Sequence, residues 1–183
     1  MATENARGMH LDSEFVVGDA TQLPFTRDSF TACTAIDALV YIPDRNRVFA
    51  TVADTLVPDG VFVVSDLVTQ SDAIETERRL VDSFSDAWDM PPLGTVEAYK
   101  AALDDTSFEL KAVEDITKHS IGRFRKWTTL YLQLLTSPLR ALIERLLGAY
   151  DLDPEAITEQ VRKAHHALPF LRHVIFVAEM EAT

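Results

Sequence analysis

The distribution of apolar residues divides the chain into short continuous runs and longer stretches with helical spacing. The runs are rich in β-branched and aromatic residues and end at glycine, proline or aspartate, a pattern typical of buried strands. We predict five strands from them: Glu14–Val17, Thr31–Ile36, Val61–Asp66, Phe108–Ile116 and Phe170–Met180.

Between these runs apolar residues recur every three or four positions, which predicts helices. The helices are expected over Asp44–Leu56, Ser71–Trp88, Thr95–Asp105, Ser120–Leu135, Ser137–Gly148 and Asp153–Leu168. The buried face of the fifth should consist of Leu139, Leu142, Ile143 and Leu146. A strand, a helix and a strand follow one another around Asp44, an order that indicates two parallel strands joined by a crossover helix and predicts an α/β fold.

Composition and charge narrow the classes of protein to which the chain can belong. It has 183 residues, 47% of them hydrophobic, and a formal net charge of −12 from 29 acidic and 17 basic side chains. These totals predict one globular domain over residues 1–183. An acidic surface repels phosphate backbones and anionic membranes, so we expect neither nucleic acid nor a membrane as a partner. A single cysteine, Cys33, rules out an intrachain disulfide and favours a cytoplasmic location.

Polar residues follow three of the predicted strands at their carboxyl ends. They are Gly18-Asp19-Ala20, the Ile36-Asp37 junction and Ser65-Asp66. A lone acid at a strand end usually caps a turn. In an open parallel sheet, however, ligands bind beyond the carboxyl ends of the strands, so three such positions together favour a binding site.

Three sequence blocks carry a resemblance to a known family. They are GDATQLPF at Gly18–Phe25, SFTACTAIDALVYIPD at Ser29–Asp44 and LVPDGVFVVSD at Leu56–Asp66. In order and spacing they resemble class I S-adenosylmethionine-dependent methyltransferases, especially the small-molecule branch with terpenoid, polyketide and sarcosine/dimethylglycine methyltransferases. The block at Leu93–Thr117 and the last strand resemble the same branch more loosely.

The resemblance implies S-adenosylmethionine as cofactor and a small molecule as substrate. It implies that the Asp19 carboxylate accepts a hydrogen bond from the adenine amino group, that Ala20 offers a backbone amide, and that the backbone of Ile36 lies along the cofactor. Tyr41 stands where many relatives have a histidine. The positions that we expect to face the acceptor are Tyr41, Asp66, Trp88, Trp127 and Tyr131.

Asp66 and His119 are the candidates for taking a proton during the reaction. His119 follows the strand that we expect to end near Ile116, on the ligand side, where it is either a base or a solvated loop residue. His165 and His166 are adjacent on a predicted helix and therefore point about 100° apart, so we expect no metal site there. Residues 118–168 should form a helical insertion or lid before the last strand.

The amino-terminal part of the chain lacks features that are typical of the family. The six glycines include no G-x-G spacing, so the glycine-rich loop that holds the ribose and methionine part of the cofactor is absent. The segment from Glu4 to Ala20 resembles the end of the second helix running into the third strand, so we expect an amino-terminal part of the family's pattern to be missing. The fold expected is a Rossmann-like methyltransferase sheet without its first two strands and with helices on both faces.

The family's strand order is 3-2-1-4-5-7-6, so loss of two strands would isolate Glu14–Val17 and leave Thr31–Ile36 as an exposed edge open to a second chain or a dimer. The sequence is compatible with two functions. One is the carboxyl-terminal part of a small-molecule methyltransferase. The other is a non-catalytic methyltransferase-like module, or half of a split enzyme, that does not bind the cofactor alone.

Overall fold

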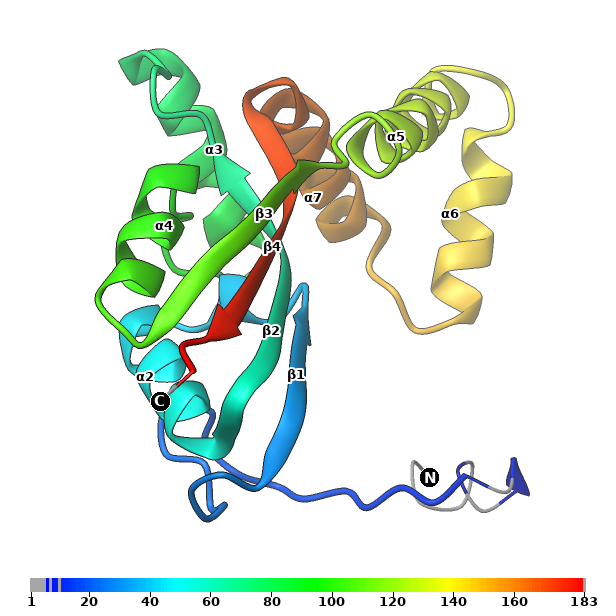
Figure 1. Cartoon of the computed structure of the whole chain (residues 1–183). Helices are drawn as coiled ribbons and strands as arrows, with labels where there is room; N and C mark the ends of the chain where they lie inside the picture. Colours follow the sequence, from blue (N-terminus) through cyan, green and yellow to red (C-terminus); the bar gives the residue numbers. More distant parts are fainter. Residues whose placement is uncertain (1–5, 7, 10, 183) are drawn as a thin grey trace.

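The computed structural model describes residues 6, 8, 9 and 11–182 and shows a mixed α/β fold built on one open sheet (Figure 1). The strands are β1 (Phe30–Ile36), β2 (Leu56–Thr69), β3 (Phe108–Asp115) and β4 (Leu171–Met180). Their order is β1-β2-β4-β3, with β1 parallel to β2 and with β4 antiparallel to both of its neighbours. This order corresponds to the 4-5-7-6 part of the expected sheet.

Two helices cover one face of the sheet. Helix α2 (Arg45–Thr55) begins at Asp44, whose side chain accepts a hydrogen bond from the Arg47 backbone N–H at 3.1 Å. Helix α4 (Val96–Asp104) begins at Thr95, which accepts in the same way from Ala98. Both starts agree with the sequence prediction, because a short polar side chain satisfies the free N–H groups of the first turn.

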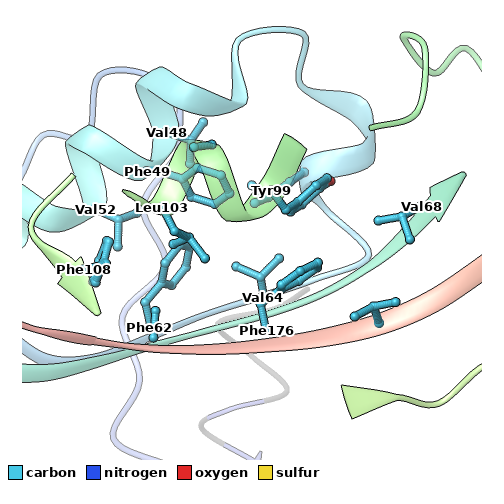
Figure 2. Close-up of a cluster of buried hydrophobic side chains, with 14 of the residues drawn as sticks. Val48, Phe49, Val52, Phe62, Val64, Val68, Tyr99, Leu103, Phe108 and Phe176 are labelled. Atoms are coloured by element: carbon cyan, nitrogen blue, oxygen red, sulfur yellow. The ribbon is translucent and has the colours of Figure 1, made fainter. Parts of the chain in front are cut away.

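The main core lies between these helices and the sheet (Figure 2). The Tyr99 ring from α4 stacks on Phe176 of β4 at 5.0 Å between ring centroids, and Phe49 of α2 meets Phe62 of β2 edge to face at 5.8 Å. Each of these side chains is at most 2% exposed. Aromatic packing of this kind adds about 0.5–1.5 kcal/mol per pair to the area burial.

A second cluster of buried residues gathers three more helices at the carboxyl end of β2. Helices α3 (Glu75–Ala87), α5 (Ile121–Leu135) and α7 (Pro154–Ala167) contribute Phe84, Ile121 and Ala164 to it. The stretch from α5 to α7 lies between β3 and β4 in the chain, where the sequence predicts a helical insertion.

Helix α6 (Arg140–Ala149) corrects one prediction. None of its residues is buried, and Leu142 and Leu146 are 54% and 53% exposed, although their spacing predicts a buried face. Figure 1 shows α6 standing away from the sheet, beside α5 and α7. The apolar residues of α6 thus form a stripe as predicted, but the described structure leaves this stripe unburied.

The predicted strand at Glu14–Val17 is also wrong. The structure has no strand there, and Phe15, Val16 and Val17 are 56%, 59% and 103% exposed. A strand needs a neighbour for its backbone groups, and within the described residues none lies beside this segment. The helix end expected before residue 11 falls largely outside the described residues. β1 is therefore the edge of the described sheet, as the sequence predicts, and Ile36 at its end is 70% exposed.

The segment Val57-Pro58-Asp59-Gly60 forms an irregularity inside the long strand β2. Phe30 pairs with Leu56 and Ala32 with Val61, so the extra residues bulge out of the ladder. Asp59 has φ 61, and a Cβ at Gly60 would lie 2.7 Å from the carbonyl oxygen of Val57. Only glycine fits at that position without a shift of the backbone.

No helix within residues 6, 8, 9 and 11–182 has both the length and the hydropathy that crossing a bilayer requires.

Candidate functional site

A cavity of about 310 Å³ opens at the carboxyl ends of β1 and β2. Its walls are mainly apolar and come from the short helix after β1, from β2, α3 and α5: Val40, Leu67, Phe84, Trp88, Met90 and Ile121. A polar group consisting of Asp37, Ser120 and His173 lies at its margin. A largely apolar cavity with a few polar side chains is typical of sites that bind small molecules.

The backbone turns sharply at the end of β1, and this turn places Asp37 at the cavity. Asp37 has φ 48, and its N–H donates to the carbonyl oxygen of Ser65 at 2.8 Å. A residue other than glycine in this left-handed region costs about 1 kcal/mol or more, and such strain is concentrated at functional sites. The short helix Leu39–Tyr41 follows, burying Leu39 and Val40 and leaving Tyr41 49% exposed.

His173 contacts residues at the ends of three strands, two through its imidazole ring and one through its backbone. The Nε2 atom lies 2.9 Å from Ser65 Oγ on β2 and 3.2 Å from Asp37 Oδ1 beyond β1. The His173 backbone N–H donates to Thr117 Oγ1 at 3.0 Å, and its side chain is only 12% exposed. These contacts hold the ring in one orientation at the wall of the cavity.

His173 is not among the site residues predicted from the sequence. The signal was present, because a histidine interrupts the apolar run Phe170–Met180 two residues after β4 begins. Its importance depends on the antiparallel placement of β4 beside β2, which sets His173 directly opposite Leu67. That pairing joins residues more than 100 positions apart and is not visible in any local pattern.

Asp66 lies on the other face of β2. Side chains alternate along a strand, so Leu67 faces the cavity while Asp66 points into the core between the sheet and α4. Asp66 is fully buried; its Oδ2 accepts a hydrogen bond from the Tyr99 hydroxyl at 2.7 Å, and its Oδ1 has no hydrogen-bond partner among the residues that the structure describes. The expectation that Asp66 faces the acceptor conflicts with this position.

Burial raises the pKa of Asp66 to about 6, although the hydrogen bond from Tyr99 and the positive charge of Arg45 act in the opposite direction. Burial next to this carboxyl raises the pKa of Tyr99 as well. The guanidinium of Arg45 lies 6.0 Å from the Tyr99 ring centroid and donates to the carbonyl oxygen of Leu39 at 2.9 Å. Arg45 therefore ties the polar pair in the core to the short helix that borders the cavity.

The remaining positions expected to face the acceptor divide into two groups. Tyr41 and Trp88 line the cavity. Trp127 is 64% exposed, and the Tyr131 hydroxyl lies 3.1 Å from Thr158 Oγ1, linking α5 to α7 away from the cavity lining. His119 is exposed in the turn before α5, next to the cavity residue Ser120.

The residues expected at the adenine end lie in the loop before β1 and at the end of β1. The backbone N–H and the hydroxyl of Thr21 both donate to Asp19 Oδ1 at 2.8 Å, and these bonds lower the pKa of Asp19. Arg47 of α2 donates to the carbonyl oxygen of Thr21 at 3.1 Å and holds the loop against that helix. The Asp19 carboxylate is thus ionised and exposed, and Oδ2 has no hydrogen bond within the described part of the chain.

A larger hollow of about 710 Å³ lies between α5, α6 and α7. Charged side chains such as Arg140, Glu144 and Arg162 line it, and Arg140 and Glu144 pair with each other at 2.7 Å. This hollow lies away from the carboxyl ends of the strands. We therefore assign the candidate ligand-binding site to the smaller apolar cavity.

Comparison with known proteins agrees with the fold. Residues 1–64 match a family described as methyltransferase domain. The chain is 24% identical to the methyltransferase GfsG of Streptomyces halstedii over 63% of its own length and 41% of that protein. It is 31% identical to the sterol 24-C-methyltransferase of Debaryomyces hansenii, again over 63% of its length but over 32% of the relative. The chain thus spans less than half the length of these curated relatives.

Solved structures resemble nearly the whole chain. A putative sarcosine dimethylglycine methyltransferase from Galdieria sulphuraria superposes with a TM-score of 0.75 at 14% identity, over 99% of this chain and 64% of that one. The [4+2]-cyclase SpnF gives 0.72 at 16% identity over 100% and 62%. One protein with this fold is thus named a cyclase, and the fold alone does not decide the reaction.

A geranyl diphosphate methyltransferase in complex with SAM gives a TM-score of 0.66 at 19% identity, over 97% of this chain and 62% of that one. At these identities the likeness concerns the fold. Residues 1–64 thus match a methyltransferase domain, and the described residues share the fold of the methyltransferases compared above.

Proposed function

We propose that this chain is the acceptor-binding, carboxyl-terminal part of an enzyme that transfers a methyl group from S-adenosylmethionine to a small molecule with an apolar body. The observation that carries the proposal is the apolar cavity with one polar margin at the carboxyl ends of β1 and β2. Relatives named for sterols and structural neighbours named for geranyl diphosphate act on molecules of this kind, which supports the choice.

The residues at the adenine end fit the cofactor. Asp19 is an ionised carboxylate whose Oδ2 has no hydrogen bond within the described residues and can accept from the adenine amino group; Ala20 next to it and Ile36 at the end of β1 offer backbone groups. When bound, S-adenosylmethionine supplies an electrophilic methyl group on a sulfonium sulfur. No G-x-G loop exists in the sequence, so we propose that residues outside this set, on another segment or another chain, hold the ribose and the methionine part.

The chain's own contribution is to bind and orient the acceptor. Trp88, Phe84 and Leu67 exclude water from the cavity, and α5 begins at its rim with Ile121. In this proposal residues 118–168 act as the lid over the acceptor. Because a sulfonium donor is already reactive, alignment of acceptor and methyl group accounts for most of the rate gain.

A binding experiment tests whether this chain holds only the adenine end of the cofactor. The chain is titrated calorimetrically with adenosine and, separately, with S-adenosylmethionine. If only the adenine end has contacts here, both ligands bind weakly, with dissociation constants within about threefold of each other. Asp19→Ala should weaken both by about tenfold, because it removes a hydrogen bond to a charged group. Asp12→Ala, at another exposed acid, is the matched control and should change neither.

Two results would contradict the proposal. S-adenosylmethionine binding a hundredfold more tightly than adenosine would mean that this chain also holds the methionine part. The second candidate function, a methyltransferase-like module that does not bind the cofactor alone, is favoured by the missing glycine loop and by the exposed edge of β1. It predicts binding of neither ligand at millimolar concentration.

A further inference from the structure

We propose that His173 is the general base of the acceptor site and that the acceptor is a hydroxyl compound methylated on oxygen. The inference rests on the proposed function, because it requires that the cavity holds the acceptor. Its support is the position of Asp37 and His173 at the polar margin of an otherwise apolar cavity, with Ser65 beside the His173 ring.

The two contacts of Nε2 decide which ring nitrogen is the base. The carboxylate oxygen Oδ1 of Asp37, 3.2 Å from Nε2, would repel a lone pair on that atom and therefore favours the tautomer with the proton on Nε2. Ser65 Oγ at 2.9 Å can accept from the same N–H. A neutral imidazole with Nε2 protonated has its lone pair on Nδ1. No described residue hydrogen-bonds to Nδ1, which leaves this atom for the acceptor.

The surroundings keep the ring in place. His173 lies on β4, which pairs with β2 on one side and with β3 on the other, so its backbone cannot shift independently of the sheet. Thr117 holds its N–H, and the strained turn at Asp37 is fixed by the hydrogen bond to Ser65. A base held by packing and by a second layer of hydrogen bonds is organised before the substrate binds.

The chemistry of a hydroxyl acceptor requires such a group. As the hydroxyl oxygen forms its bond to the methyl carbon, the bond from that carbon to sulfur breaks and its electron pair stays on sulfur. The hydroxyl proton moves to Nδ1 of His173. The imidazolium that forms is stabilised by the carboxylate of Asp37, which remains ionised and acts as a positioning residue.

The tautomer of His173 can be measured on the unaltered chain without any ligand. At a pH where the ring is neutral, nitrogen-15 spectra distinguish a protonated from an unprotonated ring nitrogen. We expect the proton on Nε2, and a mixture of tautomers in Asp37→Asn, because an amide can also donate. A proton on Nδ1 in the unaltered chain would overturn the assignment of the base.

Binding of a matched pair of probes tests the acceptor class. The chain is titrated with 2-naphthol and with its methyl ether, 2-methoxynaphthalene, which fills the same apolar volume but has no proton to donate. We expect 2-naphthol to bind about tenfold more tightly, because of the hydrogen bond to Nδ1. His173→Phe should abolish that preference, and His119→Phe, at the exposed histidine near the same cavity, should keep it.

The outcomes separate the inference from the function on which it rests. Equal binding of the two probes to the unaltered chain, or a preference that survives His173→Phe, overturns the role of His173 and leaves the acceptor cavity standing. Binding of neither probe at millimolar concentration overturns the acceptor cavity itself and the inference with it.

Discussion

The buried carboxyl of Asp66 makes the stability of this protein depend on pH in an unusual direction. Asp66 is fully buried; the Tyr99 hydroxyl donates a hydrogen bond to Oδ2, and Oδ1 has no hydrogen-bond partner within the described part of the chain. Its pKa is about 6 in the folded chain, against 3.8 for an ordinary aspartate. Between these two values the folded state binds more protons than the unfolded state, so the free energy of unfolding falls as pH rises.

The magnitude follows from the two pKa values. A shift of one unit corresponds to about 1.36 kcal/mol, so a shift from 3.8 to about 6 predicts a loss of roughly 2 to 3 kcal/mol between pH 4 and pH 7. Asp66→Asn removes this titration and keeps an oxygen that can accept from Tyr99. Any cost of burying the Asn amide is the same at each pH and cancels when the slopes are compared.

Urea unfolding at pH 4, 5, 6 and 7 measures the effect. The difference in unfolding free energy between Asp66→Asn and the unaltered chain should rise by roughly 2 to 3 kcal/mol in favour of the variant from pH 4 to pH 7. Asp72→Asn, at an exposed aspartate, is the control for the general effect of removing one charge. A difference that stays constant over this range would refute the account of Asp66.

Two further substitutions test the packing, both by urea unfolding at pH 7. Leu146→Ser on the exposed stripe of α6 should change the free energy of unfolding by less than about 0.5 kcal/mol. Phe176→Ala in the core should lower it by about 3–5 kcal/mol. Similar losses for the two variants would mean that α6 is buried. Gly60→Ala should cost about 1–3 kcal/mol, because its Cβ would lie 2.7 Å from the Val57 carbonyl oxygen. An unchanged midpoint would show that the bulge relaxes freely.

Local signals in the sequence predicted most of the elements. The side chains of Asp44 and Thr95 cap α2 and α4 at the expected positions, and the apolar run that begins near Val61 lies within β2. These features depend on residues within one or two turns of each other. The predictions failed where burial needs a distant partner, as for Glu14–Val17 and for the stripe on α6.

The candidate site likewise depends on contacts between residues that are distant in the sequence, which local patterns do not predict. Tyr41 and Trp88, which the sequence analysis expects to face the acceptor, line the cavity because they follow or precede recognisable elements. Asp66 was expected at the ligand because it ends an apolar run, but β2 continues to Thr69 and the pleat turns Asp66 into the core. His173 was missed because only the pairing of β4 with β2 brings it to Ser65 and Asp37.

The central claim is that this chain contributes separate places for the adenine end of a cofactor and for an apolar acceptor. Amide and methyl chemical shifts measured with adenosine, with 2-naphthol and with both together test it most directly. The account predicts simultaneous binding, with adenosine shifting Asp19 and Ala20 and with 2-naphthol shifting Leu67, Trp88 and His173. Mutual displacement of the two ligands, or 2-naphthol shifts gathered around Arg162 in the hollow beside α7, would contradict it.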